Sequence, residues 1–229
     1  MKALIIYSGG MDSSTLLHLY KDSIAMAISF DYGSKHNDQE FKFAQMNIEE
    51  LGIPHHRINL KEAMSLFKSD LLQSGGDIPE GHYAADNMSK TVVPFRNGIM
   101  LSIAVGIAES NGLDTVLIAN HFGDDAQYPD CRLGFITPLT RAIQAGTDGK
   151  VTLLAPFTEL NKRDIARLGN GLNLDYAKTW SCYKEGEVHC GKCGTCVERV
   201  WALQGNDPTV YLDKDFAIET LRQAGEWDE

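Results

Sequence analysis

The sequence predicts an α/β protein with a doubly wound, mostly parallel sheet, and three observations lead to this fold class. Short apolar runs alternate with segments of helical periodicity along the chain, as they do in strand–helix–strand units. The first apolar run is followed directly by a glycine-rich turn and then by a new helical pattern. The length of 229 residues, of which 43% are hydrophobic, suits one packed domain with an appendage.

The expected elements follow one another as strand and helix. Strands are expected over residues 3–7, 24–30, 56–60, 115–119 and 151–155, where apolar residues run together. The spacing of Leu16, Leu17 and Tyr20 predicts a helix after the first strand, and further helices are expected over residues 40–51 and 99–110. Ligands of such sheets bind beyond the carboxyl ends of the strands. The loops that follow the first, second and fourth strands are therefore the expected site.

The charge and the hydropathy of the chain argue against several classes of function. A net charge of −10, from 21 basic and 31 acidic side chains, argues against an extended surface that follows a nucleic-acid backbone. No apolar run comes near the ~20 residues that span a bilayer, and the first strand follows the N-terminus without a secretion signal. We therefore expect a cytoplasmic protein that acts on a small molecule, with no membrane or nucleic-acid partner.

The segment Ser-Gly-Gly-Met-Asp-Ser at residues 8–13 is the strongest local motif. Glycines let the backbone turn so that its N–H groups face an anion, and the positive end of the following helix adds to the attraction. A Walker loop is excluded because no Gly-Lys-Ser/Thr follows the glycines. A carboxylate beside phosphates needs a bridging cation, so Asp12 is a candidate Mg²⁺ ligand. The motif resembles the pyrophosphate loop of the ATP pyrophosphatases, and an ordinary strand–helix turn is the alternative.

The cysteines point to a metal centre. Four of the five lie within fifteen residues near the C-terminus, and in a reducing compartment such clustering favours a metal over disulfides. Two overlapping Cys-x-x-Cys steps suit a tetrahedral, structural zinc site, and an iron–sulfur cluster is the alternative. The expected ligands are Cys182, Cys190, Cys193 and Cys196. Cys131 stands apart and is expected to be only a neighbour of the site.

Residues 74–97 do not fit a helix or a strand. This segment is long, glycine-rich and polar, with aromatic and basic residues mixed in. Structureless stretches of this length in a compact domain are usually lids or insertions. We therefore expect a substrate lid here.

Together these motifs resemble those of the 7-cyano-7-deazaguanine synthases, the QueC family of queuosine biosynthesis. The resemblance runs from about residue 2 to residue 211. It is carried by SGGMDS (8–13), SFDYG (29–33), IPEGHYA (78–84), TVVPFRN (91–97), YPDCR (128–132), PFTELNKRDIARLG (156–169) and WSCYKEGEVHCGKCGTCVER (180–199). It implies the adenine-nucleotide α-hydrolase-like fold of the PP-loop ATPases. Residues 1–175 would form the nucleotide-binding domain, and residues 176–229 a C-terminal segment with a four-cysteine zinc knuckle and a helical tail.

The resemblance also implies a reaction. Members of the family convert 7-carboxy-7-deazaguanine and ammonia to the nitrile with ATP. A carboxylate is a poor electrophile, and transfer of AMP to it supplies a leaving group while Mg²⁺ offsets the charge of the pyrophosphate. Ammonia then gives an amide, and a second adenylation on the amide oxygen permits elimination of AMP. Each nitrile therefore uses two ATP.

The family motifs imply roles for individual residues. Asp12, Lys162 and Arg96 are the expected catalytic residues, with Lys162 directed at the leaving pyrophosphate. ATP is expected to contact Ser8, Gly9, Gly10, Met11, Asp12, Ser13, Ser14, Thr15, Phe30, Tyr32 and Gly33. The deazapurine is expected to contact His82, Tyr83, Arg96, Asn97, Asp124, Asp130 and Arg132. From the residues alone, Lys162 could equally be an exposed residue in the first turn of a helix.

Two departures from the family pattern lie near the expected base site. Phe95 stands where we expect an Asn before Arg96, and the stretch Asn-His-Phe-Gly-Asp-Asp at residues 120–125 is unusual. They leave open a related enzyme that passes the activated deazaguanine to another amine, such as a protein or peptide N-terminus. A tRNA-modifying PP-loop enzyme and a nucleotide-binding regulator are further alternatives. A homodimer that forms through the C-terminal segment is a hypothesis only.

Overall fold

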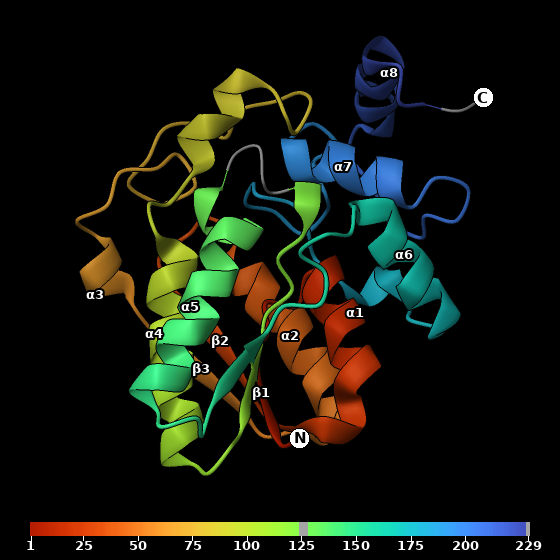
Figure 1. Ribbon diagram of the computed structural model, residues 1–229. Helices are drawn as coiled ribbons and strands as arrows, with labels where there is room; N and C mark the ends of the chain where they lie inside the picture. The colour runs from red at the N-terminus through yellow and green to blue at the C-terminus, as the bar shows by residue number, and fades with distance from the viewer. Residues whose placement is uncertain (124–127, 228–229) are drawn as a thin grey trace.

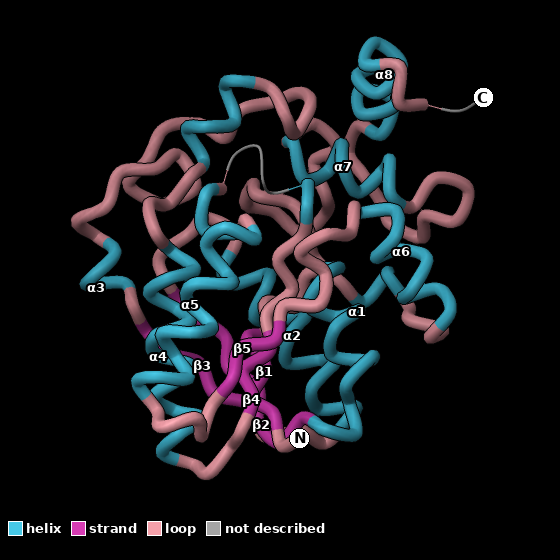
Figure 2. The backbone as a smooth tube through the Cα atoms, viewed as in Figure 1, coloured by secondary structure: helices cyan, strands magenta, loops and turns pink. Residues whose placement is uncertain are grey.

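The computed structural model describes residues 1–123 and 128–227 and is built on a five-stranded sheet in the order β3-β2-β1-β4-β5 (Figure 1, Figure 2). The strands are β1 (Ala3–Ile6), β2 (Ile24–Asp31), β3 (His55–Asn59), β4 (Thr115–Leu117) and β5 (Thr152–Leu154). Every neighbouring pair is parallel. The predicted α/β class is confirmed, and each expected strand is found within two residues of its predicted ends.

Helices cover both faces of the sheet (Figure 1). They are α1 (Met11–Tyr20), α2 (Asn37–Leu51), α3 (Lys61–Met64), α4 (Arg96–Ser110), α5 (Leu133–Gly146), α6 (Lys162–Gly171), α7 (Gly194–Ala202) and α8 (Lys214–Ala224). In β1, Leu4 belongs to the core cluster that contains α4 and α5, whereas Ala3 and Ile5 belong to the cluster of α1, α2 and α6. This alternation buries both faces of the strand, which is why it reads as a continuous apolar run.

Two helices begin three residues earlier than the apolar periodicity predicts. At the start of α2 a polar side chain bonds the preceding turn, and α4 is capped by a residue distant in the sequence. α2 begins at Asn37, whose Oδ1 accepts a hydrogen bond from the backbone N–H of Ser34 at 2.9 Å. α4 begins at Arg96, and the carboxylate of Asp130 accepts a hydrogen bond from the backbone N–H of Asn97 at 2.8 Å. Because Asp130 lies in a different segment, the local sequence pattern could not reveal this cap of α4.

The segment over residues 74–97 is more regular than expected. It contains a 3-10 helix at Asp86–Thr91, and its last two residues start α4. Its middle is tied to the cysteine-rich segment by a backbone bridge between Glu80 and Cys193. The N–H of Gly81 also donates to the carbonyl of Lys192 at 3.0 Å. The two irregular segments therefore pack against each other.

Residues 86–110 are long and apolar enough to cross a membrane by length and composition, contrary to the expectation from the sequence. In the fold, Leu101, Ala104 and Ala108 of this stretch are fully buried in the core cluster that includes β1 and β4. A core helix of a globular domain can pass the same test. Within the described residues, α4 is such a core helix.

Candidate active site

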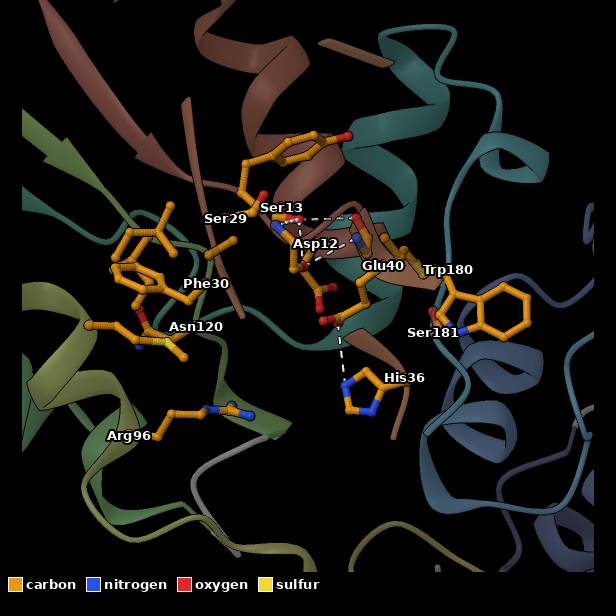
Figure 3. Close-up of a pocket in the computed structure, with 18 of the residues that line it drawn as sticks. Asp12, Ser13, Ser29, Phe30, His36, Glu40, Arg96, Asn120, Trp180 and Ser181 are labelled. Atoms are coloured by element: carbon orange, nitrogen blue, oxygen red, sulfur yellow. Dashed lines mark hydrogen bonds and ion pairs between the residues drawn. The ribbon is translucent and has the colours of Figure 1, made fainter. Parts of the chain in front are cut away.

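A cavity lies at the carboxyl ends of β1, β2 and β4, where the strand order reverses. β2 lies on one side of β1 and β4 on the other, and this arrangement creates the crevice in which doubly wound folds bind ligands. The three loops expected at the site all contribute to the lining of the cavity. Figure 3 shows Phe30, Asn120 and Arg96 on one side of it, and Trp180 and Ser181 on the other.

Glycines shape the loop between β1 and α1. Gly9 has a φ of +77°, and a Cβ at this position would lie 2.6 Å from the backbone N of Ala44 and the carbonyl O of Glu40. Only glycine lets the loop lie this close to α2. Gly10 is the N-cap of α1 and makes no side-chain capping bond, so the first N–H groups of the helix are left for a ligand.

The polar side chains of this loop leave one carboxylate oxygen without a partner. The hydroxyls of Ser8 and Ser13 are 3.0 Å apart, and Ser13 Oγ donates to the carbonyl of Gly10 at 3.2 Å. Asp12 Oδ2 accepts from Lys162 Nζ at 2.6 Å, whereas Asp12 Oδ1 is buried without a hydrogen-bond partner among the described residues. A hard cation would satisfy such an oxygen. The loop therefore fits a phosphate group together with a divalent cation.

Lys162 lies at the first position of α6 and is buried, with 8% of its surface exposed. Its ammonium group donates to Asp12 Oδ2 at 2.6 Å and lies 3.1 Å from His121 Nε2 and 3.3 Å from Glu198 Oε2. Lys162 is thus not an exposed residue of a helix start. It places a positive charge directly beside the phosphate-binding loop.

A second part of the cavity combines Arg96 with aromatic side chains. Arg96 Nη1 donates to the hydroxyl of Tyr32 at 3.0 Å, and its guanidinium lies 5.3 Å from the centre of that ring. Tyr83, Tyr128 and Tyr183 also line this part. Within residues 1–123 and 128–227, Arg96 forms no ion pair with a carboxylate. This part of the cavity suits a flat ring that carries a negative charge.

Burial shifts the pKa values of two groups that line the cavity. It raises the pKa of Glu40, in the first turn of α2, to about 8, and the charge of Arg96 opposes this shift only in part. It lowers the pKa of His36 to about 3, with a further contribution from Arg96. The closest atoms of the pair, His36 Nε2 and Glu40 Oε1, are 3.6 Å apart (Figure 3). Both groups are therefore mostly uncharged at pH 7.

The cavity brings together many, but not all, of the predicted ligand residues. Those that line it are Ser8, Gly10, Met11, Asp12, Ser13, Phe30, Tyr32, Tyr83, Arg96, Asn97 and Lys162. Gly9, Ser14, Thr15, Gly33, His82, Asp130 and Arg132 lie around it without lining it. Asp130 instead caps α4, and His82 Nε2 lies 3.1 Å from Glu226 Oε2 near the C-terminus. Asp124 lies outside the described residues.

Several residues of the site had no predicted ligand role. Asn120 and His121 come three and four residues after the end of β4, and their position beyond the carboxyl end of a central strand could have identified them. Glu40 and Glu198 lie inside helices, where no local motif distinguishes them from solvated residues. Trp180 comes just before the cysteine segment, and the sequence shows no reason for it to line the cavity.

The four clustered cysteines form a compact, buried set of sulfur atoms. All four lie within 4.8 Å of one another, with 3.9 Å between Cys190 and Cys196 and 4.0 Å between Cys182 and Cys193. Tetrahedral Zn–S bonds of about 2.3 Å would place the sulfurs about 3.8 Å apart. The backbone N–H groups of Lys192 and Cys193 donate to Cys190 Sγ, each at 3.3 Å. The donor set therefore fits one tetrahedral metal ion.

The parallel sheet, the glycine-rich phosphate loop and the cysteine cluster together define an α/β nucleotide-binding protein of the PP-loop class, with four C-terminal cysteines that could hold a metal ion. A family model described as "Queuosine biosynthesis protein QueC" matches residues 2–207. The chain belongs to this family, as the sequence motifs predicted.

Individual relatives agree with this assignment. The 7-cyano-7-deazaguanine synthase of Porphyromonas gingivalis is 58% identical over 212 residues, which cover 91% of this chain and 96% of the relative. The synthase of Desulfotalea psychrophila is 52% identical over 215 residues, covering 92% and 98%, and that of a Ruegeria species is 45% identical over 223 residues, covering 94% and 95%. A solved structure of an NMN synthetase from Francisella tularensis is a more distant match, with a TM-score of 0.47, 15% identity, and coverage of 100% of this chain and 79% of that one.

Proposed function

We propose that this protein is a 7-cyano-7-deazaguanine synthase, an ATP-dependent ligase that forms the nitrile from 7-carboxy-7-deazaguanine and ammonia. The observation that carries the proposal is an identity of 45% to 58%, over more than nine-tenths of the chain, to relatives of that name. The phosphate loop and the aromatic, cationic part of the cavity support it independently.

In this proposal the loop between β1 and α1 binds the phosphates of ATP. The N–H groups at the start of α1 and the hydroxyls of Ser8 and Ser13 hold the β and γ phosphates. Lys162 offsets the charge that develops on the leaving pyrophosphate. Asp12 Oδ1 is the candidate ligand for Mg²⁺, which supplies further charge neutralisation when bound.

The acceptor binds in the part of the cavity around Arg96. The guanidinium, which Tyr32 orients, pairs with the carboxylate of the deazaguanine acid, and Tyr83 and Tyr128 contact the ring. An oxygen of that carboxylate attacks the α phosphate and releases pyrophosphate. Ammonia then displaces AMP from the acyl carbon and loses a proton, which gives the amide. The amide oxygen attacks the α phosphate of a second ATP and releases a second pyrophosphate. Loss of AMP and two protons from the adenylated amide then leaves the nitrile.

The cysteine cluster is proposed to hold a structural zinc ion. Four thiolate ligands complete a tetrahedral site and leave no open position for a substrate. The metal would then hold the segment over residues 180–199 against the nucleotide site. Metal analysis of the purified protein distinguishes zinc from the iron of an iron–sulfur cluster, which also absorbs visible light.

One incubation tests the proposed function. The protein is mixed with 7-carboxy-7-deazaguanine, ATP, Mg²⁺ and ammonium, and the products are read by mass spectrometry with AMP quantified. We expect the free nitrile and two AMP per product, and a loss of more than about 100-fold in Asp12→Asn, because the cation loses its charged ligand. Glu187→Gln, at an exposed position, is the control.

Two other outcomes would change the assignment. AMP formation with only an amide, or with a conjugate to an added peptide, would favour the enzyme that uses another amine, which Phe95 and residues 120–125 motivate. Absence of AMP with a folded, metal-loaded protein would refute the proposal.

A further inference from the structure

Two carboxylates flank the buried Lys162 ammonium, and they hold it differently. Asp12 Oδ2 accepts a hydrogen bond at 2.6 Å, whereas Glu198 Oε2 lies 3.3 Å away in an ion pair without a hydrogen bond. The Glu198 side chain is only 9% exposed, and its Oε2 has no hydrogen-bond partner in the described part of the chain. A buried carboxylate oxygen without a donor is unfavourable. Glu198 is therefore placed to accept a bond that it does not receive in this state.

The proposed reaction makes two demands on Asp12. Its carboxylate holds Lys162 in this structure, and it is also the candidate ligand of the cation that accompanies ATP. When phosphates fill the loop, the lysine must direct one of its three N–H donors at them. A buried ammonium that moves away from its carboxylate needs another one, because an uncompensated buried charge is strongly unfavourable. Glu198 already lies within reach of Lys162.

We propose that Glu198 is a positioning residue that accepts Lys162 when Asp12 takes the cation. Glu198 then keeps the ammonium charged and directed at the leaving pyrophosphate. His121 Nε2, 3.1 Å from Lys162 Nζ, steadies the lysine through this exchange. The inference rests on the proposed function to the extent that ATP with a divalent cation is a substrate.

The metal centre and a buried arginine set the position of Glu198. It lies on α7, whose N-cap is Cys193 and whose first turn contains Cys196, two residues before Glu198. The next residue, Arg199, is fully buried and donates to the carbonyl of Tyr176 at 2.6 Å. A helix of nine residues has little stability of its own, so these anchors determine where the carboxylate lies. The cysteine cluster is thereby linked to the lysine of the phosphate site.

The Mg²⁺ dependence of ATP binding tests this inference. Glu198→Gln keeps the size of the side chain and removes its charge, and the exposed Glu187→Gln in the same segment is the matched control. Calorimetry on the metal-loaded proteins gives the ATP affinity at increasing Mg²⁺, without the deazaguanine acid. We expect Glu198→Gln to need about tenfold more Mg²⁺ for the same affinity, because Lys162 stays on Asp12. The control should match the parent protein.

If folded, metal-loaded Glu198→Gln showed the same Mg²⁺ dependence of ATP affinity as the parent protein, the inference would be overturned. Glu198 would then have only a structural role. Should that variant lose its metal or unfold, Glu198→Asp decides, because it keeps the charge on a shorter side chain. For Glu198→Asp we expect a smaller increase in the Mg²⁺ concentration needed for the same ATP affinity. A Mg²⁺ dependence equal to that of the parent protein would overturn the inference. These measurements do not use the acceptor, so a failure to form nitrile would refute the proposed function without affecting this result.

Discussion

At Gly9 two physical effects require glycine, and Gly52 allows them to be separated. Both residues have left-handed backbones, with φ of +77° and +67°. A Cβ at Gly9 would lie 2.6 Å from backbone atoms of α2, whereas one at Gly52 would have no atom of the described residues within 4 Å. We expect Gly52→Ala to lower the free energy of unfolding by about 1 kcal/mol through backbone strain alone. Gly9→Ala should lower it by more and abolish ATP binding. Urea unfolding and calorimetry measure the two effects, and equal losses in both variants would contradict the clash.

Glu40 should make the protein less stable as the pH rises from about 5 to about 8. Burial raises its pKa from 4.5 to about 8, and its ionisable neighbours include Arg96, Tyr32 and the neutral His36. Between these two pH values the folded state keeps a proton that the unfolded state has released, so the free energy of unfolding falls as the pH rises. Glu40→Gln should remove this slope. Urea unfolding at several pH values measures it, with Glu187→Gln as the exposed control.

His36 contributes the opposite slope at acidic pH. Burial lowers its pKa from 6.5 to about 3. As the pH falls below 6.5, the unfolded state binds a proton that the folded state does not, so stability is lost toward acid. This loss of stability below pH 6.5 should persist in Glu40→Gln. If it disappeared in that variant, His36 and Glu40 would titrate as one unit.

The sequence identified single residues of the site better than it identified their contacts. Asp12 lies in a recognisable loop and Lys162 in a family motif, and both line one cavity. Their pairing joins residues 150 positions apart, which no local pattern contains. His121 and Glu198 complete the surroundings of the lysine only through the packing of β4 and α7 against α6. Such contacts are properties of the fold and not of any one segment.

Among the elements, those that carry their own boundary signal were predictable. The five strands were readable because both faces of the sheet are buried. The Asn161–Asp164 capping box that starts α6 is also local, whereas α4 is capped from a distance by Asp130. α5 and α7 were not predicted. α5 contains Pro138, a residue that normally breaks a helix, and α7 begins within the cysteine cluster, where the spacing suggested a metal knuckle.

Removal of the proposed metal from the cysteine cluster should loosen two segments together. Cys193 bridges to Glu80, and a Cβ at Gly194 would lie 3.2 Å from the Cα of Tyr83, so α7 and residues 80–83 are packed closely. We expect a chelator to speed hydrogen exchange in both segments while β1 and α4 stay protected. Added zinc should restore the protection. Faster exchange confined to the cysteine loop would show that the metal does not support the segment that contains Tyr83.

In the whole molecule, the proposed C-terminal segment takes part in the site. Ser181, Tyr183 and Thr195 line the same cavity as the phosphate loop and Arg96. The proposed parts over residues 1–175 and 176–229 therefore share one ligand site. The cysteine spacing could not predict this shared cavity. It indicates a local metal site and carries no information about the surface against which that segment packs.

The charge of the whole molecule predicts that the substrate is a free base and not a nucleotide within tRNA. The net charge of −10 repels a phosphate backbone. The three cationic residues that line the cavity, Lys162, Arg96 and Arg57, make contacts within the protein. We expect no tRNA binding at micromolar concentrations in about 0.15 M salt, and no effect of added tRNA on turnover of the free acid. Filter binding at several salt concentrations measures the first and AMP formation the second. tRNA binding that weakens steeply with salt would instead reveal a local basic surface. That result would contradict the prediction and favour the tRNA-modifying PP-loop enzyme.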